Sequence, residues 1–338
     1  MERVLAMGTD VTIIGAGLSG LVAAHQIQTA GQSVTLLDKG RSVGGRLATR
    51  RIGDGIADHG AQFFTVRSDD FQQQVDRWLA KDLVYVWGHG WSDGSVKRTQ
   101  GDGHARYATR GGMNALAKDL AASLTNIHVS TKVTGIEFLA NGWRVHDADG
   151  DIIESDVLIM TPPVPQSLAL IEHIPLTDAD KNALERINYG PCLCGLFVID
   201  GEVLLPEPGA QQNFEEKVYW IADNKAKGIS PDERIVTVHV EARYSRTHYD
   251  DDSTETLAFL CEALNPYLAE GATIREAQLK KWRYSIPLTT HPHDILQAEG
   301  YPLIFAGDAF GGRGRVEGAY LSGKKAGEAA VRLLKQPQ

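Results

Sequence analysis

The chain lacks several features that mark whole classes of protein. Its 338 residues include three cysteines, Cys192, Cys194 and Cys261, too few and too odd a number for a disulfide framework. No stretch approaches the run of ~18 apolar residues that spans a membrane. Positions 1–10 have no apolar core of signal-peptide length, so we expect a cytoplasmic protein without membrane association. Lys and Arg number 34 against 43 Asp and Glu, and this net charge of −9 gives no basic footprint for nucleic acid.

Metal and thiol chemistry also lack their usual spacings. The eleven histidines include no HExxH or comparable ligand pattern. His291 and His293, separated by a proline, fit an exposed loop better than a pair of ligands, so no metal is expected. Cys192 and Cys194 do not have the spacing of a redox pair. We expect one of them in the core and the other elsewhere.

Glycine, by contrast, is abundant and clustered. It supplies 35 residues, about 10% of the chain against the usual ~7%. Residues 11–14 predict a buried strand, 21–30 a helix, and 34–37 a second buried strand ending at Asp38. Between the first strand and the helix lies the segment Gly15–Gly20, GAGLSG. This order predicts a parallel βαβ unit.

The GAGLSG segment has the spacing of a dinucleotide fingerprint. Gly15 would make the turn, Gly17 would let a pyrophosphate approach the backbone, and Gly20 would let helix and strand pack closely. Asp38, eighteen residues after Gly20, is placed for ribose hydroxyls. The motif alone is weak, but its strand–turn–helix context favours a nucleotide site over a purely structural turn. Asp38 disfavours a 2′-phosphate but does not separate FAD from NAD.

The remaining pattern predicts a second domain inserted into the first. A nucleotide-binding domain is expected from residues 1–70, 112–164 and 286–338, and a substrate domain from 71–111 and 165–285. The expected helices are 69–81, 114–123, 177–186, 252–268 and 318–335. Antiparallel strands are expected within 83–108 and in a meander of 127–129, 133–138, 143–145 and 152–153. Further strands are expected at 156–160, 193–199, 235–240, 278–284 and 303–306.

Two further motifs favour FAD through their resemblance to known flavin-binding signatures. Arg41-Ser42-Val43-Gly44-Gly45-Arg46 resembles the GG-R signature of the flavin amine oxidase superfamily, although alone it could be a solvated basic loop. Ile304-Phe305-Ala306-Gly307-Asp308 resembles the second FAD signature of that superfamily. Segments 58–65 (DHGAQFFT) and 314–323 (GRVEGAYLSG), with 110–113 (RGGM) and 282–284 (WRY), resemble the renalase branch, its bacterial members most closely.

The resemblance implies an α/β fold with a Rossmann-type FAD-binding domain and an inserted α+β substrate domain. This is the architecture of p-hydroxybenzoate hydroxylase and of the amine oxidases. It implies FAD, which we expect to be non-covalent because neither Cys192 nor Cys194 lies where a covalent link would form. The fingerprint and the family pattern together predict these FAD contacts: Gly15, Gly17, Ser19, Gly20, Asp38, Lys39, Arg46, Gln62, Phe63, Val133, Asp308 and Val316.

The expected substrate pocket follows from the same resemblance. Ala309 stands where the bacterial pattern has tryptophan, which predicts a wider or reshaped pocket. Arg67 is available for a ligand phosphate. Trp282 and Tyr284 share one face of a strand and would either stack near the flavin or pack a domain interface. The predicted substrate-binding residues are Phe63, Phe64, Thr65, Arg67, Ala309, Trp282 and Tyr284.

The activity implied is oxidation of misreduced dihydronicotinamide dinucleotides, which carry hydride at position 2 or 6. Hydride would pass to flavin N5 and then to oxygen, giving NAD(P)+ and hydrogen peroxide. No catalytic residue is assigned, because loss of hydride restores the aromatic ring without an obligatory base. The expected partners are the dinucleotide and oxygen, with no oligomeric state implied. The alternatives are a flavin-containing amine oxidase and a flavin-binding protein without turnover.

Overall fold

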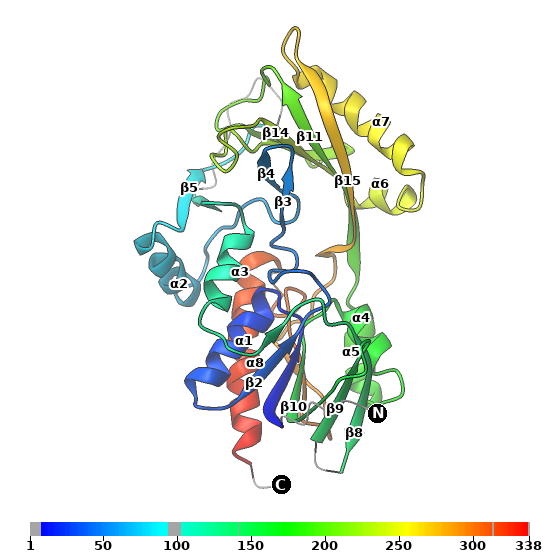
Figure 1. The fold of residues 1–338 in the computed structure, drawn as a ribbon. Helices are drawn as coiled ribbons and strands as arrows, with labels where there is room; N and C mark the ends of the chain where they lie inside the picture. Colours follow the sequence, from blue (N-terminus) through cyan, green and yellow to red (C-terminus); the bar gives the residue numbers. More distant parts are fainter. Residues whose placement is uncertain (1–7, 94–102, 141, 313, 337–338) are drawn as a thin grey trace. The chain divides into compact units, whose positions relative to one another are not determined.

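The computed structural model describes residues 8–93, 103–140, 142–312 and 314–336. The chain forms two compact units, each assembled from separate stretches of sequence (Figure 1). Unit 1 contains the described residues of Met1–Gly45, Leu116–Asn188 and Pro287–Gln338. Unit 2 contains those of Arg46–Ala115 and Tyr189–Ile286.

Unit 1 is built on a mostly parallel sheet of eight strands. Its order is β16-β17-β10-β1-β2-β7, with β8 and β9 continuing as an antiparallel meander from β10. The strands β1, β2 and β10 are largely buried, which is typical of a parallel sheet covered on both faces. Their bounds are β1 Thr9–Ile14, β2 Val34–Leu37, β7 Ile127–His128, β8 Val133–Leu139, β9 Gly142–Asp147, β10 Ile152–Met160, β16 Leu296–Gln297 and β17 Leu303–Phe305.

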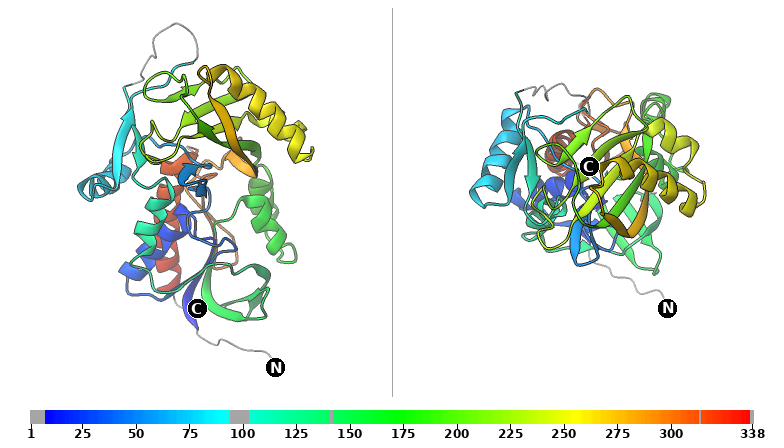
Figure 2. Two further views of the ribbon diagram at one scale, coloured as in Figure 1. Left: turned by 45° about the horizontal axis from the view of Figure 1, so that its top comes forward. Right: turned by 90° about the horizontal axis from the view of Figure 1, so that it is seen from above.

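Two helices of unit 1 lie side by side against this sheet. They are α1, Leu18–Thr29, and α8, Arg315–Leu334 (Figures 1 and 2). A Cβ at Gly323 would collide with the backbone of Ser19, and one at Gly327 with the carbonyl of Ala23. Glycine therefore permits the close approach of the two helices. The other helices are α3 Asn114–Ala121, which begins in unit 2, α4 Val164–Leu170 and α5 Asp178–Glu185.

Unit 2 is built on a five-stranded sheet of order β12-β13-β14-β11-β15. Unit 2 also contains two separate antiparallel pairs of strands, the β3–β4 hairpin and the pair β5–β6. Its strands are β3 Thr49–Ile52, β4 Gly55–Asp58, β5 Val84–Gly88, β6 Arg106–Thr109, β11 Tyr189–Asp200, β12 Ala210–Gln212, β13 Val218–Asp223, β14 Ile235–Val240 and β15 Thr273–Pro287. Its helices are α2 Asp69–Ala80, α6 Ala242–Thr247, α7 Ser253–Leu264 and the 3-10 turn η1 Asn265–Tyr267.

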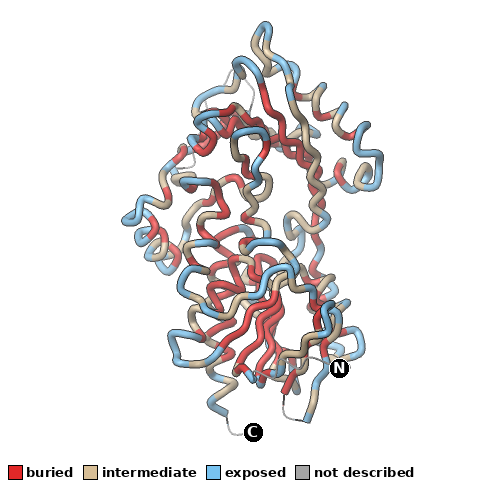
Figure 3. The backbone as a smooth tube through the Cα atoms, viewed as in Figure 1, coloured by how far each residue is buried: buried red, intermediate tan, exposed pale blue. Residues whose placement is uncertain are grey.

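The two faces of the unit 2 sheet pack on different elements. Phe197 and Val238 share an apolar cluster with Leu260 of α7. On the other face, Leu196 shares a cluster with Ile52 and Ala57 of the β3–β4 hairpin. In both units the buried backbone follows the sheet strands (Figure 3). The alternation of side chains along β11 explains how one strand serves both clusters.

Most expected elements are present. The βαβ unit, the buried strand at 156–160 and the closing helix are confirmed, and the strands expected within 83–108 form the antiparallel pair β5–β6. Of that stretch, residues 94–102 lie outside the described part of the chain. The prediction for Cys192 and Cys194 was wrong: both are buried in the same cluster, because residues two apart on a strand share a face.

The units divide the chain differently from the predicted domains. Residues 46–70 group with unit 2, because the β3–β4 hairpin packs on β14. Residues 165–188, with α4 and α5, group with unit 1. The assignment of one unit to FAD and the other to the substrate stays a prediction.

Candidate functional site

The candidate cofactor residues of unit 1 gather at one edge of its parallel sheet. Gly15 directly follows β1, Asp38 follows β2, and Thr161 follows β10. Gly307 and Asp308 come just after β17. The carboxyl ends of parallel strands share an edge, which is where open α/β sheets bind ligands. Hydrogen bonds join these turns, since the Thr161 hydroxyl donates to the carbonyls of Ile14 and Gly15 at 2.8 and 3.1 Å.

The three fingerprint glycines have different physical reasons to be glycine. Gly15 has φ +99, and its Cβ would collide with the Thr161 side chain. A Cβ at Gly20 would collide with the Gly15 carbonyl. Gly17 has φ −74 and open space where its Cβ would stand. Contacts within the described chain therefore do not require glycine at position 17. A ligand that approaches the protein backbone at this point would require it, because a side chain would stand in the way.

The start of α1 fits a diphosphate. Gly17 caps the helix without a side-chain hydrogen bond, and the first turn holds no acidic residue. The Ser19 hydroxyl is buried and has no hydrogen-bond partner among the described residues. Unpaired N–H groups and the positive end of the helix dipole attract an anion at such a terminus. These residues fit the pyrophosphate of FAD.

Asp38 and the glycine pair hold the fingerprint loop in shape. The Asp38 carboxylate accepts hydrogen bonds from the N–H groups of Ala16, at 2.7 Å, and Gly40, at 2.6 Å. Gly44 donates to the Ala16 carbonyl at 2.8 Å and forms a bridge with Gly17. The GG part of the GG-R motif thus lies directly against the fingerprint. Nearby, the exposed Lys39 ammonium lies 3.4 Å from the Gln166 amide oxygen.

The remaining predicted contacts of unit 1 occupy ends of elements. Asp308 is 8% exposed, and its neighbour Gly307 donates to the Ser322 hydroxyl of α8 at 2.8 Å. Val316 lies in the first turn of α8, and Val133 begins β8; both are buried. Ala309 is buried, and its carbonyl accepts a hydrogen bond from the N–H of His291 at 2.7 Å.

The other predicted residues belong to unit 2. The Arg46 guanidinium donates to the carbonyls of Tyr284 and Ser285, at 3.4 and 3.3 Å, and lies 5.8 Å from the Tyr189 ring centre. The Trp282 indole donates to the His59 carbonyl at 2.8 Å and stacks on that imidazole. Tyr284 meets Tyr189 edge-on at 5.7 Å between ring centres. Packing within unit 2 therefore accounts for the contacts observed at Trp282 and Tyr284.

Phe63 and Phe64 point to opposite sides of an extended segment. Phe63 lies 5.0 Å from the Trp91 ring centre and 5.4 Å from that of Trp220. Phe64 is 3% exposed and packs against Phe71, Trp78 and Tyr107, in the core beside α2. This packing gives Phe64 a structural role. Thr65 is half-buried and Arg67 is exposed.

Five buried polar atoms of unit 2 have no hydrogen-bond partner within the described part of the chain, and two of them belong to the tryptophans beside Phe63. They are the indole nitrogens of Trp91 and Trp220, Nε2 of His239, Nδ1 of His59 and the amide oxygen of Gln62, each unpaired among the described residues. Burial is the main factor that lowers the pKa of His59 to about 4 and that of His239 to about 3. Both imidazoles are therefore neutral at physiological pH. Unpaired donors and acceptors in an aromatic setting suit a flat, polar-edged ligand.

Asp58 and Lys227 form a fully buried ion pair in the same region. The Lys227 ammonium lies 2.6 Å from the Asp58 carboxylate, and neither side chain is exposed. Burial lowers the pKa of Lys227, and the Asp58 charge opposes that shift. The sequence analysis assigned no role to Lys227, because a lysine in the polar segment DNKAKG gives no sign of burial.

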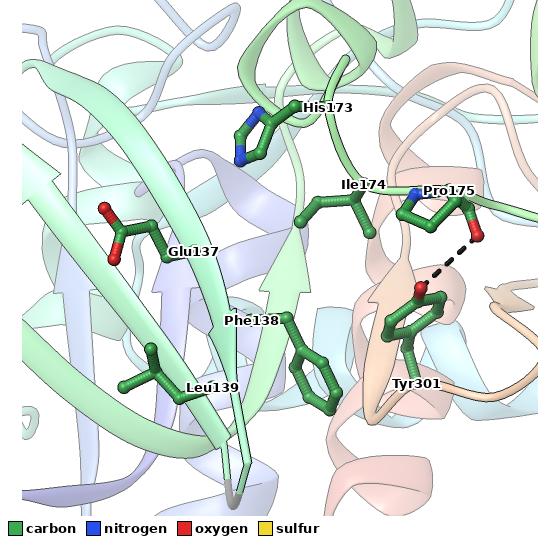
Figure 4. Close-up of a pocket in the computed structure, with 7 residues that line it drawn as sticks. All are labelled: Glu137, Phe138, Leu139, His173, Ile174, Pro175 and Tyr301. Atoms are coloured by element: carbon green, nitrogen blue, oxygen red, sulfur yellow. Dashed lines mark hydrogen bonds between the residues drawn. The ribbon is translucent and has the colours of Figure 1, made fainter.

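Three further observations do not bear on the candidate site. Among the described residues, no group of three or more His, Cys, Asp or Glu side chains could hold a metal. A surface pocket of about 420 Å³ in unit 1 contains none of the predicted residues (Figure 4). In that pocket the Tyr301 hydroxyl donates to the Pro175 carbonyl at 3.3 Å. None of the helices in the described ranges has the length and apolar character needed to cross a membrane.

Comparison with known families shows which family the chain belongs to. Residues 86–331 match the model of the flavin containing amine oxidoreductases, and residues 13–80 match an NAD(P)-binding Rossmann-like domain. The chain belongs to the flavin-containing amine oxidoreductase family. Membership implies a bound flavin and an oxidoreductase that acts on small molecules with oxygen. The predicted family and fold class are therefore confirmed.

Individual proteins are also similar to this flavin amine oxidoreductase in sequence or in fold. It is 24% identical to renalase from Mus musculus over 293 residues, which cover 81% of this chain and 84% of that protein. A protein of Exiguobacterium sp. 255-15, provisionally named protoporphyrinogen oxidase, has the same fold, with TM-score 0.75, 14% identity and coverage of 97% and 99%. Putrescine oxidase bound to putrescine matches with TM-score 0.70, 15% identity and coverage of 96% and 99%.

Proposed function

We propose that this flavin amine oxidoreductase is a renalase-like oxidase of 2- or 6-dihydroNAD(P), producing NAD(P)+ and hydrogen peroxide. The similarity to mouse renalase over 81% of the chain is the observation that carries the proposal. Segment 58–65, through which the sequence resembles renalases, lies among aromatic side chains and unpaired polar atoms of unit 2. The specific substrate is the part of the proposal that needs testing.

In this proposal FAD is bound non-covalently and supplies a two-electron acceptor that oxygen reoxidises. The diphosphate lies at the N-terminus of α1, with Gly17 open to its approach and Ser19 donating its hydroxyl hydrogen. Asp38 accepts from ribose hydroxyls while it holds the fingerprint loop. Arg46, Gln62, Phe63, Val133, Asp308 and Val316 supply the remaining contacts.

The substrate surface of this proposal is aromatic. Phe63 with Trp91 and Trp220 offers a flat apolar setting for a nicotinamide ring, and the two indole N–H groups suit the carboxamide oxygen. The exposed Arg67 pairs with a substrate phosphate. No acid–base residue is required, because loss of hydride from a dihydropyridine restores aromaticity. Asp58 and Lys227, already paired with each other, are not assigned proton transfer.

Oxygen consumption tests the proposal. We expect rapid uptake with 2- or 6-dihydroNAD(P), slow uptake with ordinary 4-dihydroNADH and almost none with simple monoamines. NAD(P)+ and hydrogen peroxide should form in equal amounts, one of each per oxygen consumed. Rapid uptake with an amine and none with any dihydronucleotide would instead identify an amine oxidase.

The amine oxidase alternative has two observations in its favour. The fold matches putrescine oxidase bound to putrescine over 96% of this chain. Ala309, in place of the tryptophan of the bacterial renalase pattern, also leaves room for a different ligand.

A further inference from the structure

The buried pair of Asp58 and Lys227 is a costly polar feature of unit 2. Besides Asp58, the Lys227 ammonium contacts the Gln62 carbonyl at 2.6 Å and lies 4.9 Å from the Trp87 ring centre. Taking two charges out of water costs free energy that their attraction often fails to recover. Folding stability alone is therefore a weak reason for such a pair.

Asp58 is held from several directions. Its second carboxylate oxygen accepts from the Thr49 hydroxyl at 2.5 Å and from the Met113 N–H at 2.8 Å. Its carbonyl accepts from the Thr237 hydroxyl at 2.9 Å. Because every one of these partners belongs to unit 2, the network fixes both Asp58 and the lysine bound to it.

The network ends at Gln62. The Gln62 amide nitrogen donates to the carbonyls of Asp58, at 2.8 Å, and Gly60, at 3.2 Å, while its own carbonyl accepts from Lys227. These two acceptors determine which way the side-chain amide faces. The other end of the amide, Oε1, is buried and has no partner among the described residues. A buried acceptor without a partner needs an explanation, and a hydrogen-bond donor on a bound ligand supplies one.

We propose that Lys227 and Asp58 are positioning residues that hold Gln62 so that its Oε1 accepts a hydrogen bond from FAD. This inference rests on the proposed function, in which Gln62 is an FAD contact. The oxidised isoalloxazine ring carries an N–H group that can serve as the donor. Lys227 fixes the peptide of residue 62, and the Asp58 carbonyl fixes its side chain.

Titration of the apoprotein with FAD, followed by quenching of flavin fluorescence, measures the effect. Lys227→Met should weaken FAD binding at least tenfold and change the visible spectrum of the bound flavin. Lys225→Met is the matched control, since Lys225 is an exposed lysine two residues away. It should leave affinity and spectrum unchanged. Equal affinities for the two variants would overturn the proposal.

A double-mutant cycle shows whether Lys227 acts through Gln62. In the Gln62→Leu background, Lys227→Met should weaken FAD binding less than twofold further, because the group that Lys227 positions is gone. Independent, multiplying losses would show that Lys227 acts elsewhere and would contradict the inference.

Removal of one charge could unfold the chain, so a neutral pair completes the design. Asp58→Asn combined with Lys227→Met removes both charges and should fold. We expect its FAD affinity to stay at least tenfold below wild type, because the contact to the Gln62 carbonyl is lost. Wild-type affinity in this variant would mean that the pair serves stability only.

The double-mutant cycle measures FAD binding, so its result does not depend on which substrate is oxidised. A wild-type protein that binds FAD but ignores dihydronucleotides would refute the proposed substrate and leave this inference standing. A wild-type protein that binds no FAD would overturn both.

Discussion

Single residues at the carboxyl edge of the unit 1 sheet divide into those that shape the loop and those that face a ligand. Gly15 and Gly20 are glycine because the protein's own atoms occupy the space of a side chain. Gly17 and Ser19 have no such internal explanation, since one faces open space and the other carries an unpaired buried hydroxyl. Under the proposed function, the diphosphate of FAD accounts for both residues.

Substitution of two of these glycines separates the roles. Gly17→Ala should cost the apoprotein less than about 1 kcal/mol of unfolding free energy, through a poorer helix cap, yet weaken FAD binding at least tenfold. Gly20→Ala is the control that should lose both, because its Cβ collides with the Gly15 carbonyl. Urea unfolding of each apoprotein measures the unfolding free energy, and titration with FAD measures the affinity for the cofactor. Undiminished FAD affinity in Gly17→Ala would refute the phosphate role of that loop.

The candidate site residues differ in how well they can be predicted from the sequence. The fingerprint, Asp38 and the GG-R segment were found because their roles depend on local spacing. Lys227, Trp220 and His239 were missed because their burial arises from contacts with segments distant in the sequence. Phe63 and Phe64 were treated alike, although an extended segment turns neighbouring side chains to opposite sides.

At the scale of elements, α1 depends on α8. The two helices approach closely through Gly323 and Gly327, and the same contact places the first turn of α1 at the sheet edge. The sequence predicted both helices, at 21–30 and 318–335, and in the structure each begins three residues earlier. It missed the β3–β4 hairpin because Thr49–Ile52 and Gly55–Asp58 show no clear polar–apolar alternation. That hairpin gains its structure by packing on β14.

Tightening the contact between α1 and α8 should therefore affect the cofactor. A Cβ in Gly323→Ala would collide with the Ser19 backbone, so we expect a loss of about 2 kcal/mol in unfolding free energy. FAD binding should weaken as well, because the collision displaces the first turn of α1. Lys325→Ala, at an exposed position of α8, should change neither quantity. Wild-type FAD affinity in Gly323→Ala would show that the first turn of α1 does not contact the cofactor.

At the scale of the whole molecule, each unit is assembled from stretches distant in sequence, and unit 2 carries the acid-sensitive groups. The folded pKa values of His59 and His239, about 4 and about 3, lie below the ordinary value of 6.5. The unfolded chain therefore binds more protons than the folded chain between these values and pH 6.5. Their contribution to stability is complete above pH 6.5 and decreases as the pH falls.

Acid should accordingly destabilise unit 2. Between pH 7 and pH 4.5 we expect the unfolding free energy to fall by about 5 kcal/mol, about half from each histidine. Tryptophan fluorescence is a suitable probe, since five of the six tryptophans belong to unit 2 and one, Trp143, to unit 1. His239→Gln should reduce this pH dependence by roughly half. A free energy independent of pH, in wild type and variant alike, would contradict the buried neutral state of both imidazoles.

Anaerobic titration of the purified holoprotein tests the central claim most directly. With oxygen absent, the visible flavin absorbance reports electron transfer from the substrate alone. One equivalent of 2- or 6-dihydroNAD(P) should bleach one equivalent of bound FAD rapidly, and admission of oxygen should restore the yellow colour. Ordinary 4-dihydroNADH should bleach it slowly and monoamines hardly at all. Bleaching by a primary or secondary amine, with no response to either dihydronucleotide, would contradict the account.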